Sequence, residues 1–119
     1  MELKEGMYVR TKKGIFQITN DKTFIENKIE YIGVNGRYTS IDVNTVIKAS
    51  HNIIDLIEVG DYVNGLKVIE VREHLHNDIE IVLSNGEFQW SFSKNDSDYD
   101  IKNIVTKEQF ESMKYSLEG

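Results

Sequence analysis

The chain of 119 residues contains no cysteine and no proline. The missing cysteines exclude a disulfide framework, a zinc finger or ribbon, an iron–sulfur centre and a cysteine nucleophile. No apolar run approaches the length that a bilayer-spanning helix needs, and residues 1–5 lack the features of a signal peptide. We therefore expect a cytoplasmic protein that does not contact membranes.

Alanine is nearly absent as well: it occurs once, at Ala49, whereas the chain has fifteen isoleucines and ten valines. Alanine is the best helix former, and β-branched residues favour strands. The composition therefore predicts an all-β protein.

Positive charge is scarce in the second half of the chain. Residues 58–119 have thirteen acidic and six basic side chains, a balance of −7, whereas residues 1–57 have seven acidic and eight basic side chains, a balance of +1. The net charge of −6 therefore belongs to the second half. An acidic chain repels phosphate backbones, which disfavours general nucleic-acid binding.

The sequence resembles itself over two units of about 55 residues, a length typical of duplicated supersecondary units. Residues 3–9 resemble residues 57–63, and the pattern Gly-x-Tyr-Val begins at Gly6 and again at Gly60. Within each unit, short strand patterns alternate with turns such as Asn35-Gly36, a strong hairpin signal because both residues accept positive φ.

Each unit also ends in a helical pattern. Thr106 and Gln109 have the spacing of a capping box and predict a helix over residues 106–115 that buries Phe110 and Met113. Ser50 predicts a shorter helix over residues 52–56. A one-turn 3₁₀ helix is expected at residues 100–103.

The order of these elements resembles that of SH3-like small barrels. We therefore predict two tandem SH3-like small barrels, each followed by a short helix. The first unit covers residues 1–49, a helical linker covers residues 50–57, and the second unit covers residues 58–119.

Two stretches resemble a family of small uncharacterised proteins encoded by phages and prophages of low-GC Gram-positive bacteria. Residues 52–65 are NIIDLIEVGDYVNG, and residues 100–111 are DIKNIVTKEQFE. The resemblance implies an origin in a mobile element. It implies no activity, substrate, cofactor or catalytic residue.

Two polar clusters are candidate cation sites. His74, His76, Asp78 and Glu80 alternate, so an unbroken strand would place them on one face as possible transition-metal ligands. Residues 76–78 predict a turn, however, which favours a solvated hairpin tip over a metal site. The run Asp96, Asp98 and Asp100 lacks the glycine and glutamate that a calcium loop needs, which favours an acidic loop.

Aromatic residues offer candidates for packing and recognition. Phe88, Trp90 and Phe92 share one strand face, which we interpret as core in preference to a stacking platform. Tyr8 and Tyr62 occupy equivalent repeat positions and are interpreted as packing residues. The candidate partner contacts are Tyr31, Tyr38, Asp96, Asp98, Tyr99 and Asp100.

No catalytic set is visible, so we predict a non-enzymatic protein-interaction module that binds a host or phage protein. In a narrower form it is an acidic inhibitor of a host defence nuclease that presents carboxylates in place of DNA phosphates. The alternative is a nucleic-acid-binding barrel whose contacts come from the near-neutral first unit: Arg10, Lys12, Lys13, Lys28 and Arg37. An enzyme is the third and least favoured possibility.

Overall fold

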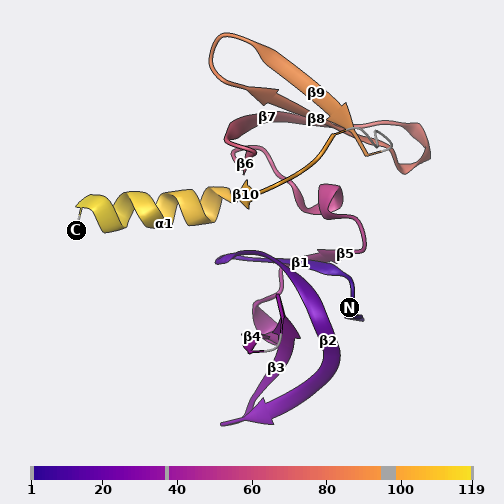
Figure 1. Ribbon diagram of the computed structural model, residues 1–119, viewed down its shortest axis with the longest axis vertical. Helices are drawn as coiled ribbons and strands as arrows, with labels where there is room; N and C mark the ends of the chain where they lie inside the picture. Colours follow the sequence, from indigo (N-terminus) through magenta and orange to yellow (C-terminus); the bar gives the residue numbers. More distant parts are fainter. Residues whose placement is uncertain (1, 37, 95–98, 119) are drawn as a thin grey trace. The chain divides into compact units, whose positions relative to one another are not determined.

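The computed structural model describes residues 2–36, 38–94 and 99–118. The chain divides into two compact units, Met1–Leu56 and Ile57–Gly119. Each unit contains one antiparallel sheet of five strands, and neither sheet closes on itself (Figure 1). The prediction of a mainly β protein is confirmed. None of the helices in the described ranges is long and apolar enough to span a bilayer.

The sheet of the first unit has the strand order β4-β3-β2-β1-β5. Its strands are β1 (Tyr8–Thr11), β2 (Gly14–Glu26), β3 (Ile29–Val34), β4 (Thr39–Asp42) and β5 (Lys48–Ser50). The 3₁₀ helix η1 (Val43–Thr45) precedes β5, and η2 (Ile53–Leu56) follows it in place of the predicted helix over residues 52–56. The core consists of Val9, Ile18, Ile32 and Val34.

The sheet of the second unit has the order β10-β6-β7-β8-β9. Its elements are β6 (Tyr62–Val63), β7 (Leu66–Glu73), the 3₁₀ helix η3 (Leu75–Asn77), β8 (Ile79–Ser84), β9 (Gln89–Ser93), β10 (Ile104–Val105) and α1 (Lys107–Glu118). The expected 3₁₀ helix at residues 100–103 is wrong. The amides of Lys102 and Asn103 donate instead to Oδ1 of Asn64, at 2.7 and 3.1 Å, which holds this stretch extended.

The two sheets share one strand order, in which the last strand of the unit pairs with the first. Both units also begin alike. Gly6 and Gly60 have φ angles of 90° and 98°, a region that glycine enters without steric cost. The Gly6 amide donates to Ile18 and the Gly60 amide to Val68, each at 2.9 Å. The two Gly-x-Tyr-Val segments therefore begin with similar backbone conformations and similar hydrogen bonds.

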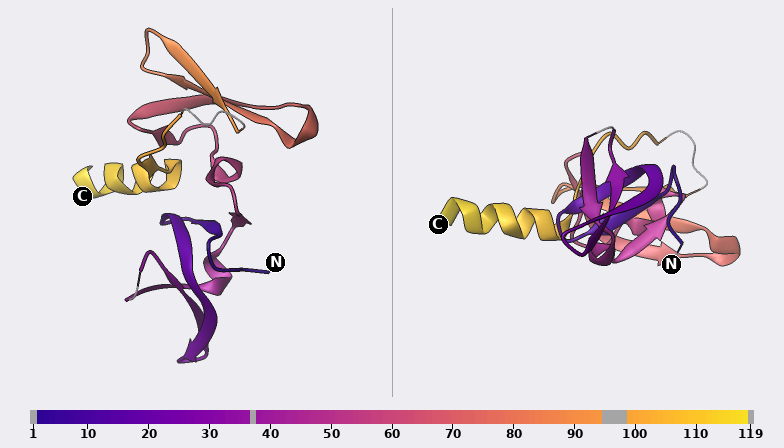
Figure 2. Two further views of the ribbon diagram at one scale, coloured as in Figure 1. Left: turned by 45° about the vertical axis from the view of Figure 1, so that its right-hand side comes forward. Right: turned by 90° about the horizontal axis from the view of Figure 1, so that it is seen from below.

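Helix α1 begins with the predicted capping box. The Thr106 hydroxyl accepts from the Gln109 amide at 3.2 Å, and the Gln109 side chain accepts from the Thr106 amide at 2.9 Å. Figure 2 shows the helix continuing directly from β10, and it extends beyond the predicted end at residue 115. The predicted burial of Phe110 and Met113 is wrong, because 42% and 50% of their surfaces are exposed. The Phe110 ring lies against that of Tyr62, with centroids 5.1 Å apart.

The aromatic face of β9 is only partly core. Phe92 is 3% exposed as predicted, but Phe88 and Trp90 are 62% and 44% exposed, so the prediction is wrong for both. Strand alternation places all three on one face, yet β9 is the edge of an open sheet. Phe88 precedes the strand, and Trp90 stays partly exposed although it stands opposite the buried Leu83, because no further strand covers its outer side in the described ranges.

Candidate functional site

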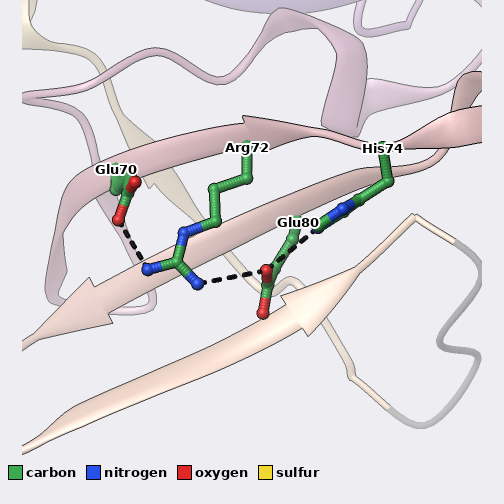
Figure 3. Close-up of polar contacts among 4 residues, drawn as sticks. All are labelled: Glu70, Arg72, His74 and Glu80. Carbon is green, nitrogen blue, oxygen red and sulfur yellow. Dashed lines mark hydrogen bonds and ion pairs between the residues drawn. The ribbon is translucent and has the colours of Figure 1, made fainter.

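The outer face of the β7–β8 hairpin carries a chain of charged side chains (Figure 3). Arg72 stands directly opposite Glu80 in the strand register. The Arg72 guanidinium contacts Glu70 at 2.8 Å and Glu80 at 3.5 Å, and Nε2 of His74 lies 3.1 Å from the same Glu80 oxygen. These four residues form a continuous surface network of ion pairs and hydrogen bonds, called the ion-pair network below.

The network shares only His74 and Glu80 with the candidate metal site that the sequence suggested. His76 lies in η3 with a φ of 62°, so the strand ends before it and the predicted turn is confirmed. In the part of the chain that the structure describes, no three histidine or carboxylate side chains are placed to hold a metal ion. Glu80 lies within hydrogen-bond distance of His74, and His76 does not join this contact.

The ion pairs shift the pKa values of the carboxyl groups. The hydrogen bond from Arg72 lowers the pKa of Glu70, and the same bond raises the pKa of Arg72. Hydrogen bonds from His74 and from Ser91 lower the pKa of Glu80. All three groups prefer their charged forms, which keeps the network intact at neutral pH.

We expect the carboxyl carbons of Glu70 and Glu80 to titrate below the ordinary glutamate range in an NMR pH series. Their contribution to stability is present at neutral pH and is lost as pH falls through the lowered pKa values. Arg72→Gln should return the midpoint of Glu70 toward its ordinary value, whereas His74 and Ser91 keep Glu80 low. A Glu70 midpoint that does not respond to Arg72→Gln would contradict this account.

The described members of the acidic loop have local partners. Tyr99 stacks on Phe92 with centroids 3.9 Å apart and planes 1° from parallel, so its ring completes the packing at β9. Asp100 is exposed, and its carbonyl accepts from the Asn64 side chain at 2.8 Å. Asp96 and Asp98 lie outside the described residues. The role of this loop in partner binding stays a prediction.

Tyr31 and Tyr38 are each linked to a third aromatic residue of the first unit, Phe24. Phe24 stacks on Tyr31, with centroids 5.5 Å apart. Tyr38 is 95% exposed and, with Phe24, lines a hollow of about 500 Å³. The hollow, called the unit 1 hollow below, also has polar walls from Asn20, Lys22, Thr39 and Ser40.

An irregularity in β2 creates this hollow. Asn20 pairs with Gly33 and Phe24 with Tyr31, so three residues of β2 stand opposite Ile32 alone. The Lys22 amide donates to the Asn20 side chain at 3.0 Å, which stabilises the bulge. The strand bends along its length in both Figure 1 and Figure 2. Gly33 has no side chain to fill the space, and it forms part of the lining.

The basic residues considered for nucleic-acid binding do not form one patch. Arg10 is fully buried, and its Nη1 donates to the Leu56 carbonyl at 2.8 Å, so its assignment as a phosphate contact is wrong. Lys12 and Lys13 lie at the turn before β2, and Lys28 lies after its far end, 13 strand residues away. Arg37 lies outside the described residues.

Phe24 and Gly33 are the site residues that the sequence analysis missed. A signal was available for Phe24, because Phe24 and Tyr31 are equally spaced about Asn27 and Lys28, and asparagine accepts positive φ more readily than most residues. In the structure Asn27 and Lys28 have φ angles of 52° and 68°. A hairpin at that turn pairs the two rings. The bulge that opens the hollow has no such signal, because it interrupts the alternation by which strands are recognised.

Comparison with protein-family models, curated proteins and solved structures gives no match for this chain. The structure itself offers two surface features: the ion-pair network of the second unit and the aromatic unit 1 hollow. The network is satisfied internally, whereas the hollow leaves large aromatic surface exposed.

Proposed function

We propose that this protein is a non-enzymatic protein-interaction module that binds its partner through the unit 1 hollow. The observation that carries the proposal is the exposure of two aromatic side chains at one hollow, Tyr38 at 95% and Phe24 at 47%. Exposed aromatic surface beside polar groups is typical of binding sites, and tyrosine is enriched among residues that dominate interface energies. The partner is a host or phage protein.

The lining of the hollow suits a polypeptide segment. Thr39, Ser40 and Asn20 supply hydroxyl and amide groups that can both donate and accept hydrogen bonds. Glu5 and Lys22 add one charge of each sign. Such a mixture complements a main chain with its alternating donors and acceptors, while the rings receive apolar side chains.

We further propose that both units are SH3-like small barrels that arose by duplication within a mobile-element gene. Support comes from the common strand order, in which the last strand pairs with the first, and from the equivalent Gly6 and Gly60 turns. A 3₁₀ helix between the fourth and fifth strands of the first unit has the position expected for this fold.

The DNA-mimicking form of the proposal is less favoured. Asp61 is fully buried and accepts two backbone hydrogen bonds, and Lys107 pairs with Glu58 at 2.9 Å. Arg72 pairs with Glu70 and Glu80. These four acidic side chains of the second unit therefore interact with groups of their own unit. The acidic loop remains the surface on which a nuclease inhibitor would depend.

Partner capture with matched variants tests the proposal. We expect Phe24→Ser with Tyr38→Ser to lower capture from infected host lysate by at least about tenfold, because exposed aromatic anchors carry most interface energy. Ile47→Ser is the control: Ile47 is an exposed apolar residue of the same unit, at 52% against 47% for Phe24, and lies outside the hollow lining.

The outcome separates the competing proposals. In one outcome the double variant still captures the partner, but capture is lost when Asp96, Asp98 and Asp100 are replaced by asparagine. This result would contradict partner binding at the unit 1 hollow and would favour the nuclease-inhibitor form. A salt-sensitive gel shift with DNA or RNA, abolished by Lys12→Ala with Lys13→Ala, would favour the nucleic-acid alternative.

A further inference from the structure

Strand β9 is the longest of the four edge strands of the two sheets. It is five residues long, whereas the other three edge strands, β4, β5 and β10, have four, three and two. Proteins usually protect edges with charged residues, proline or bulges. Residues 88–93 include none of these, and within the described ranges no strand pairs with the outer side of β9.

The register of β9 with β8 shows which backbone groups point outward. The Lys94 amide donates to the Ile79 carbonyl at 2.7 Å, and the Asn85 amide donates to the Phe88 carbonyl at 3.3 Å. Because antiparallel strands alternate their bonding direction, the residues between follow this phase. The amides and carbonyls of Gln89, Ser91 and Ser93 therefore face the outer edge.

We propose that β9 pairs with β9 of a second copy of this chain, antiparallel about a two-fold axis, with Ser91 opposite Ser91. In this register Gln89 of each copy stands opposite Ser93 of the other. All three outward residues of both copies are then used, in mutual pairs that exchange two hydrogen bonds. The two open sheets become one sheet of ten strands.

The same register brings the partly exposed Trp90 of each copy beside the buried Phe92 of the other. Trp90 pairs with the buried Leu83, and Phe92 with the buried Ile81, so this face of β9 is the inner face of the sheet. A two-fold axis perpendicular to the sheet keeps both inner faces on one side. Trp90 of one copy then stands opposite Phe92 of the other, a cross-strand pair of the kind that stabilises sheets.

Charge favours a second copy at this edge. The chain has a net charge of −6, so two copies repel each other over most surfaces. Residues 88–94 contain no carboxylate and one lysine, and the proposed register places no two like charges opposite each other. Together with the self-complementary backbone pattern, this identifies the occupant as another copy of the chain.

Sedimentation equilibrium of the full chain tests the proposal. We expect a concentration-dependent dimer, and we expect Ser91→Pro to weaken it about a hundredfold, because each copy loses one interchain hydrogen bond. The amide removed points outward, so the β8 ladder is retained and the circular dichroism spectrum should persist. Ser91→Thr keeps the amide and is expected to dimerise like the wild type.

Single cysteines report the register directly, because the chain has none of its own. Ser91→Cys should form an interchain disulfide on mild oxidation, since opposite α-carbons lie about 5.5 Å apart and disulfides span about 4.4–6.8 Å. Gln89→Cys alone should not cross-link, but mixed with Ser93→Cys it should. A monomeric wild type, a dimer unaffected by Ser91→Pro, or Gln89→Cys cross-linking as well as Ser91→Cys would each overturn the proposal.

Discussion

Replacing Asp61 with alanine is expected to lower the free energy of unfolding by about 3 kcal/mol, because two hydrogen bonds to a charged acceptor are lost. The side chain is fully buried. Its carboxylate accepts from the amides of Glu58 at 2.8 Å and Lys107 at 2.9 Å. One carboxylate thus fixes the turn that enters β6 and satisfies an amide in the first turn of α1, where negative charge is favourable.

The residue at the corresponding position of the first unit shows which of these two hydrogen bonds is present in both units. Met7 occupies the position of Asp61, and its sulfur accepts from the Lys4 amide at 3.3 Å. The bond across the entry turn is therefore common to both units, whereas the bond to the helix is specific to the second. Asp61→Asn, which keeps an oxygen acceptor without the charge, is expected to cost less than Asp61→Ala.

Urea denaturation followed by circular dichroism measures the loss, and amide hydrogen exchange locates it. Protection should fall first in α1 and β6. Glu73→Ala, at an exposed acidic position of the same unit, is the control and should change stability by no more than about 0.5 kcal/mol. An unchanged urea midpoint for Asp61→Ala would contradict the structural role assigned to this carboxylate.

Local signals in the sequence predicted local structure well. Asn35 and Gly36 form the expected turn with φ angles of 52° and 118°. Thr106 and Gln109 form the expected capping box. In each case a few neighbouring residues determine the backbone, so no knowledge of the rest of the fold is needed.

Burial was predicted less well, because it depends on what covers a face. Alternation correctly placed Phe88, Trp90 and Phe92 on one side of β9. It could not show that β9 is an edge of an open sheet, where only Phe92 is covered. The same limit applies to the unit 1 hollow, whose existence depends on a change of register between β2 and β3.

Arg10 is a second case in which burial could not be predicted from the sequence. We predicted an exposed phosphate contact, but the side chain is fully buried. Strand β1 lies between β2 and β5, so neither of its edges faces solvent. Val9 faces the hydrophobic core, and Arg10 points to the opposite face, where η2 ends. Its guanidinium donates to the carbonyl of Leu56, the last residue of η2. The arginine thereby connects β1 to η2, the segment that ends the first unit.

Arg10→Ala is expected to destabilise the first unit by about 3 kcal/mol, because a charged donor to a buried carbonyl and the packing of its aliphatic stem are both lost. Arg10→Met retains most of the stem, so the difference between the two variants measures the packing. Arg10→Lys should not restore stability, since an ammonium group cannot reproduce the geometry of the planar guanidinium. The exposed neighbour Lys12→Ala is the control and should be nearly neutral. Chemical denaturation checks the ranking, and an Arg10→Ala variant as stable as Lys12→Ala would show that the contact with Leu56 contributes nothing to folding.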